Sequence, residues 1–154
     1  MKQQLLLAQY ELQSAWLLQR IESISEEQSH LRPTEKGNSI KWLTGHILNS
    51  RMIIHSLITG QVVQSPYASL FGKGSTGELP SDAPTMTELI GAWKQLTAKF
   101  SNDLSALSEE KLATAPPFQT SIPDQTFAGL IAYFAVHESF HIGQLSQIIA
   151  ATSN

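Results

Sequence analysis

Two histidines four residues apart, His137 and His141, are the side chains of this sequence best suited to do chemistry. In a helix this spacing places both imidazoles on one face, with Cβ atoms about 5–6 Å apart, so that one metal ion could contact both. A helical wheel puts the two rings inside or at the edge of an apolar stripe formed by Leu130, Phe134, Leu145 and Ile148. The pair is therefore predicted to point into the protein.

His46 is a third candidate ligand, because it lies beside the apolar stripe of another predicted helix. A lone inward histidine is more often a hydrogen-bonded core residue than a ligand. Three inward imidazoles would instead compete for few partners, and each unsatisfied group costs about 1–3 kcal/mol, a cost that a metal ion removes for the nitrogens it binds. We therefore predict a metal site of His46, His137 and His141, and discard His55, which lies on the other side of the stripe, and His30, which lies in a link.

Three neutral ligands define the kind of metal site. They leave the ion with its full charge and with open coordination positions, whereas a closed structural site uses four ligands that usually include Cys, and the sequence has no Cys. A divalent ion of this kind can lower the pKa of a bound water to about 7 or deprotonate a thiol. Imidazole suits several metals, and we expect Zn or Ni, with Fe and Mn as alternatives. The arrangement is typical of a catalytic site.

The segment from His137 to His141 also matches the HExxH signature of zinc proteases, in which the Glu is the general base. Those enzymes take a third ligand from a downstream Glu or His, and residues 142–154 contain neither, which argues against a protease. Glu138 lies at the margin of the apolar stripe, where it could be a solvated charge, a hydrogen-bond partner of an imidazole, or a base. We keep Glu138 as the candidate catalytic residue.

The prolines indicate which elements hold these side chains. All seven fall in three windows and leave four Pro-free stretches, residues 2–24, 38–60, 85–107 and 124–152. Apolar residues in these stretches recur at helical spacing, so we predict an all-α fold, a four-helix bundle, with residues 1–154 forming a single domain. The connection 61–84 is longer than is usual in bundles, and is predicted to be either a crossover between distant helix ends or a lid over the site.

Local signals predict where these helices begin and end. Asn38 and Asp124 stand at the heads of the second and fourth stretches as candidate caps, and Thr85 with Glu88 forms a capping-box pattern at the head of the third. Gly60 predicts the end of the second helix.

Two glycines, Gly45 and Gly143, lie inside predicted helices and within two residues of a proposed ligand. Glycine in a helix costs about 1 kcal/mol relative to Ala, which suggests that something is gained in return. We predict that both glycines permit close helix approach or ligand access, and that Gly143→Leu weakens metal binding without unfolding the bundle.

Composition excludes several classes of protein. The net charge is −3 and the basic residues are scattered, so a nucleic-acid partner is not expected. The longest apolar run, residues 127–136, is half the length of a membrane-spanning helix, so no membrane partner is expected either. The absence of Cys fits a reducing compartment, and we expect a cytoplasmic location.

Two segments resemble the DinB-like superfamily of small four-helix metalloproteins, which includes the YfiT-type proteins. They are Ser39-Ile-Lys-Trp-Leu-Thr-Gly-His46 and His137-Glu-Ser-Phe-His-Ile-Gly-Gln-Leu145, and the resemblance covers nearly the whole chain. It implies that His46, His137 and His141 are the metal triad, and that the bundle has an unusual connectivity with a long link between its second and third helices. It also implies a homodimer.

The same resemblance implies an activity, because characterised relatives are transferases or isomerases that use low-molecular-weight thiols. We therefore predict a metal-dependent enzyme of the thiol S-transferase or hydrolase type that activates a small-molecule thiol or water and acts on a small-molecule substrate. The alternative is a metal- or small-ligand-binding bundle without turnover.

Overall fold

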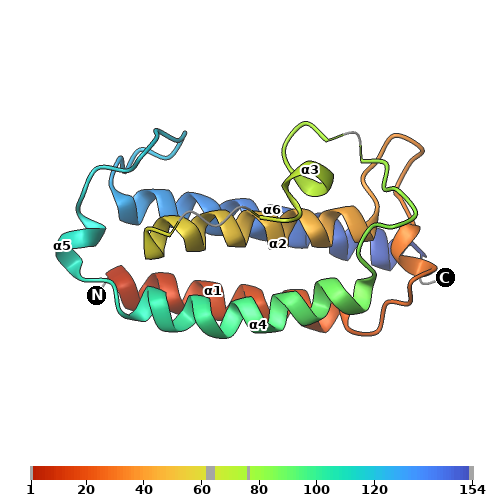
Figure 1. Ribbon diagram of the computed structural model, residues 1–154, viewed down its shortest axis with the longest axis horizontal. Helices are drawn as coiled ribbons and strands as arrows, with labels where there is room; N and C mark the ends of the chain where they lie inside the picture. Colours follow the sequence, from red (N-terminus) through yellow and green to blue (C-terminus); the bar gives the residue numbers. More distant parts are fainter. Residues whose placement is uncertain (1, 62–64, 76, 153–154) are drawn as a thin grey trace.

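The computed structural model describes residues 2–61, 65–75 and 77–152, and all of its regular elements are helical. Four helices are long: α1 (Lys2–Ile21), α2 (Ile40–Thr59), α4 (Met86–Ser105) and α6 (Phe127–Thr152). Two are single turns, α3 (Ala68–Phe71) and α5 (Glu109–Leu112), and a 3₁₀ turn spans Gln28–His30. The predicted all-α four-helix bundle is confirmed (Figure 1).

The ends of α2 and α4 follow from their capping residues. Thr85 and Glu88 form the predicted capping box at the start of α4, and Gly60 ends α2 with φ +69°, a left-handed conformation that favours glycine. The predicted cap Asn38 is displaced by one residue, because the Ser39 hydroxyl accepts the Trp42 backbone N–H and takes that role.

The start of α6 lies two residues later than predicted. Asp124 Oδ1 accepts the Thr126 N–H in a turn that precedes the helix, and the Thr126 hydroxyl accepts the Gly129 N–H. A Cβ at position 129 would lie 1.8 Å from the Asp124 carbonyl oxygen, so this turn requires glycine there. A short polar side chain that makes its own local turn competes with its use as a helix cap, which explains the displacement.

The order of the helices in the bundle differs from a simple up-and-down arrangement. In Figure 1, α1 and α6 run from the end marked N toward the other end, whereas α2 and α4 both run back. Hydrogen bonds support this arrangement, since Tyr10 donates to the Ile131 carbonyl and Gln13 to that of Ala135. Because α2 and α4 are parallel neighbours, the connection between them must return along the length of α2. In its described parts, residues 65–75 and 77–84, the long connection is therefore a crossover; residues 62–64 and 76 lie outside the described chain.

Each long helix packs against two others, α1 against α6 and α4, and α2 against the same pair. The buried apolar side chains form two clusters, and the first contains residues on both sides of the predicted site, among them Trp42, Leu43, Ile47, Phe71 and Leu145. The second contains Tyr10, Ile54, Phe100 and Leu104. Within the described chain, no helix is both long and apolar enough to cross a bilayer.

Candidate metal centre

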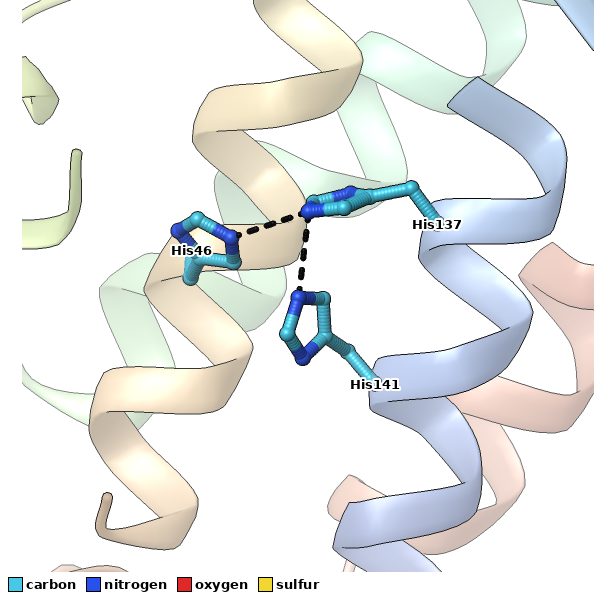
Figure 2. A group of neighbouring side chains, drawn as sticks. All are labelled: His46, His137 and His141. Carbon is cyan, nitrogen blue, oxygen red and sulfur yellow. Dashed lines mark hydrogen bonds between the residues drawn. The ribbon is translucent and has the colours of Figure 1, made fainter. Parts of the chain in front are cut away.

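Three histidine rings from two helices converge at the surface between α2 and α6. His46 comes from α2, and His137 and His141 lie one turn apart on α6 (Figure 2). His137 Nε2 is 3.3 Å from His46 Nε2 and 3.1 Å from His141 Nε2, and one ligand atom of each ring lies within 4.8 Å of the other two. The side chain of His46 is 8% exposed, and the other two are half-buried. The three residues singled out in the sequence are thus brought together.

The crossover holds the ring of His46. His46 Nδ1 is 2.6 Å from the backbone carbonyl oxygen of Phe71, which can only accept, so Nδ1 carries the proton and Nε2 presents its lone pair. Trp42 stacks on the same imidazole, with ring centroids 4.7 Å apart and planes 11° apart. The Trp42 indole N–H in turn donates to the hydroxyl of Ser75 at 2.9 Å.

His141 is oriented in the same manner, whereas His137 is not. The Nδ1 of His141 donates to Gln144 Oε1 at 2.7 Å, so its Nε2 also presents a lone pair. The buried Nδ1 of His137 has no hydrogen-bond partner in the described part of the chain. Two of the three ring orientations are therefore set by oxygen acceptors behind the ring, an arrangement common among metal-bound histidines.

The donor set fits a divalent metal ion. Two nitrogens bound at about 2.0–2.1 Å to one tetrahedral ion lie about 3.3 Å apart, close to the two separations found around His137. Without a cation, a proton on His137 Nε2 can satisfy only one of the two lone pairs that face it. A cation among the three nitrogens satisfies all of them. The cluster could thus hold a metal ion.

The electrostatics of the cluster keep its imidazoles neutral. Burial lowers the pKa of His46 and of His141 below the ordinary value. Burial, together with the neighbouring His141 and His46, lowers the pKa of His137 to about 4. Neutral imidazole is the form that binds metals, so the three rings are ready to coordinate at neutral pH.

These lowered pKa values predict how the stability of the metal-free chain depends on pH. Unfolded histidine titrates near 6.5, so below that pH the unfolded chain binds protons that the folded chain does not. The contribution of the cluster to stability is therefore complete above pH 6.5 and is lost as the pH falls toward 4. We expect the melting temperature of the chelator-treated protein to fall over this range, and to fall less steeply in His137→Asn. Equal pH dependence in both proteins would contradict the assigned pKa of His137.

Glu138 lies in the core rather than in solvent. Its side chain is 0% exposed, and its two carboxylate oxygens accept hydrogen bonds from the guanidinium of Arg51 at 2.7 and 2.6 Å. Burial raises the pKa of Glu138 and the charge of Arg51 opposes that rise. The solvated interpretation is wrong, and the partner of the carboxylate is Arg51 instead of an imidazole. The role of general base stays a prediction, and it would require the carboxylate to release Arg51.

Sequence reasoning missed Arg51, although a signal was present. On a helical wheel Arg51 lies at the edge of the apolar stripe of α2, about 40° from Ile47 and about 20° from Ile58, where a charged residue that is buried needs a partner. The discarded histidines lie away from the cluster, because His55 Nε2 is 2.7 Å from the carboxylate of Asp103 and His30 is an exposed residue near Glu26.

Gly45 and Gly143, the two glycines near the ligands, differ in the space around them. A Cβ at Gly45 would lie 2.5 Å from the ring of Phe71, so the predicted close approach is confirmed there and is made by the crossover. A Cβ at Gly143 would meet nothing within 4 Å, and the position is exposed. Close approach is therefore the wrong explanation for Gly143. Ligand access past this exposed position, and with it the weakening of metal binding by Gly143→Leu, stays a prediction.

A matched pair of substitutions checks this difference. Gly45→Ala should displace Phe71, whose carbonyl orients His46, and should destabilise the chain by about 1–3 kcal/mol, the usual cost of overpacking. Gly143→Ala should be neutral or stabilising by up to about 1 kcal/mol. Urea unfolding of both variants measures the effect. Equal stability of the two variants would show that Phe71 moves aside freely.

The fold and the cluster together define a helical bundle with a three-histidine site, and comparison with known families identifies the group. The model of the DinB superfamily matches residues 9–145, most of the chain, including all three histidines. The chain belongs to the DinB superfamily. No match was found among curated proteins.

Proposed function

We propose that this chain is a metal-dependent enzyme in which His46, His137 and His141 hold one divalent ion, Zn or Ni, with Fe and Mn as alternatives. The observation that carries the proposal is the convergence of three neutral nitrogen donors with no fourth His, Cys, Asp or Glu donor in the cluster among the described residues. Such a set leaves coordination positions for a water or a substrate. A divalent ion bound there supplies a nucleophile at neutral pH by lowering the pKa of a water or thiol.

The surroundings of the cluster support a small-molecule substrate. A groove of about 400 Å³ is lined by Gln144, which bonds to His141, and by Leu43, which lies one turn before His46. Lys36 contributes the positive charge in this lining. We expect an anionic small molecule to bind there better than a neutral one of the same size.

The second substrate that we propose is a low-molecular-weight thiol or water. Such thiols are kept reduced in the cytoplasm, so the proposal includes a cytoplasmic location. The chain's own residues would orient the reaction: the Phe71 carbonyl and Gln144 hold two rings in place, and the stacked indole of Trp42 covers one face of His46.

An assay of turnover separates this proposal from binding without catalysis. Protein loaded with Zn or Ni would be given small thiols with electrophiles of both charge types, and simple esters, while thiol consumption and acid release are followed. We expect many turnovers per chain with the wild type and none with His137→Ala. A chain that binds the metal and turns over none of these substrates would favour the alternative, a non-catalytic metal- or ligand-binding bundle.

We also propose that the chain forms a homodimer through the outer side of α1 and α6. Large apolar side chains are 42–71% exposed on this side of the two adjacent helices: Leu5, Leu12, Trp16, Val136 and Phe140. A 20-residue helix is about 30 Å long, so two neighbouring helices offer a face of roughly 600 Å², near the ~800 Å² per partner of a stable interface. Covering it with a second copy would bury these side chains.

Light scattering after size-exclusion chromatography checks the homodimer. We expect twice the chain mass of 16.9 kDa for the wild type and the monomer mass for Leu12→Glu, because an unpaired carboxylate would be buried in the interface. A monomeric wild type, or a dimeric Leu12→Glu, would contradict this surface.

A further inference from the structure

A second polar cluster lies in the core beside the three histidines. Arg51 and Glu138 are both 0% exposed, and they are joined by two parallel hydrogen bonds, Nε to Oε1 at 2.7 Å and Nη2 to Oε2 at 2.6 Å. This bidentate geometry fixes both the distance and the relative orientation of the two groups. The function proposed above gives this pair no role.

The guanidinium of Arg51 contacts all of the other long helices. Its Cζ lies 4.5 Å from the ring centroid of Tyr10 on α1, and 4.5 and 4.6 Å from those of Trp93 and Phe100 on α4. Its carboxylate partner, Glu138, is on α6. The rings pack against a flat, rigid cation, so the pair has little freedom to move relative to the bundle.

The pair crosses the same helix interface as the metal centre. Arg51 follows His46 by five residues on α2, about 7.5 Å along the helix axis, and Glu138 is next to His137 and three residues before His141 on α6. Any sliding or rotation of α6 against α2 that broke these hydrogen bonds would also move the two α6 histidines away from His46.

Stability alone does not explain why a charged pair occupies this position. Replacing a buried ion pair with well-packed apolar residues of similar volume is often neutral or stabilising. Apolar contacts, however, tolerate small shifts between helices that two directed hydrogen bonds do not. A metal site requires its nitrogens to lie within about 0.2 Å of their ideal distances, so a directed contact suits this interface.

We propose that the Arg51–Glu138 pair is the positioning device of the metal centre, which sets the separation and register of α2 and α6 so that His46 meets His137 and His141. The inference rests on the proposed metal site. In this role Arg51 and Glu138 act through the ligands and contact neither the ion nor the substrate, so the role is an alternative to that of Glu138 as a general base.

The double variant Arg51→Met/Glu138→Leu tests this inference with Co²⁺, whose visible absorption reports the geometry of its ligands. We expect the double variant to melt at or above the wild-type temperature, and to bind Co²⁺ at least about tenfold more weakly with a shifted spectrum. Arg51→Lys keeps the charges paired but loses the bidentate geometry, so it should remain folded and weaken Co²⁺ binding likewise. If the double variant does not fold, the Co²⁺ affinity and spectrum of Arg51→Lys test the positioning role on their own.

One control variant makes the outcome specific. Leu112→Ala removes a core side chain in α5, at the end of the bundle where α2 ends, and should lower the melting temperature without changing Co²⁺ affinity or spectrum (Figure 1). A wild type that binds Co²⁺, with Arg51→Lys and any folded double variant binding it equally and with the same spectrum, would overturn the positioning role alone. A wild type that binds no Co²⁺ would overturn the proposed metal site itself and this inference with it.

Discussion

Replacing His46, His137 or His141 with alanine should each raise the Kd for Zn²⁺ by roughly a hundredfold or more. Zinc sites of four ligands provide about 10–16 kcal/mol, or about 3 kcal/mol for each ligand, and such a loss corresponds to at least two powers of ten in affinity. The expected losses are similar because each ring contributes one nitrogen to the cluster. Titration calorimetry of chelator-treated protein measures them.

His30→Ala and His55→Ala are the controls for this experiment. His30 is exposed, and His55 is paired with Asp103 across α2 and α4, so neither substitution should alter the Kd. The metal-free wild type should keep its helical circular dichroism, because its two apolar clusters do not depend on the ion. Equal losses at all five histidines, or no loss at His46, would contradict the site.

Glu138→Leu alone should destabilise the metal-free chain by about 3–5 kcal/mol, because it leaves the fully buried cation of Arg51 without a counter-charge. For a chain of this length the melting temperature should fall by roughly 6–20 °C. The apolar side chain added at position 138 offsets little of this loss, because the Arg51 guanidinium would face it directly.

An exposed ion pair provides the comparison. Glu22 is 2.7 Å from Lys94, and both side chains are at least half exposed, so Glu22→Gln should change stability by less than about 1 kcal/mol. Thermal unfolding followed by circular dichroism measures both variants. If Glu138→Leu lowered the melting temperature as little as Glu22→Gln, the result would contradict the expected cost of leaving the Arg51 cation unpaired in the core.

The four helices and the three ligands could be predicted from the sequence for related reasons. Prolines confined to three windows leave room for only four long helices, and a helical wheel requires only local spacing to place His137 and His141 on one inward face. The helix starts at residues 38 and 124 were predicted less well. Neighbouring polar residues compete for the cap, and the choice between Asn38 and Ser39 depends on backbone geometry.

The partners of the ligands could not be predicted in the same way. His46 is held by a backbone carbonyl, which every residue carries, and its position at Phe71 depends on the path of the crossover. Arg51 was visible as a charge at the edge of an apolar stripe, but nothing local indicates that Glu138, on a distant helix, is its partner. Pairings between distant segments follow from how the helices dock, and helical spacing contains no information about docking.

Metal content at equilibrium is the most direct test of the central claim, which is that His46, His137 and His141 hold one divalent ion. Chelator-treated wild type and the triple variant with alanine at all three positions would be dialysed against micromolar Zn²⁺, and bound metal would be measured by elemental analysis. The account predicts one zinc ion per chain for the wild type and none for the triple variant. A wild type without zinc, or a triple variant that retains a full equivalent, would contradict it.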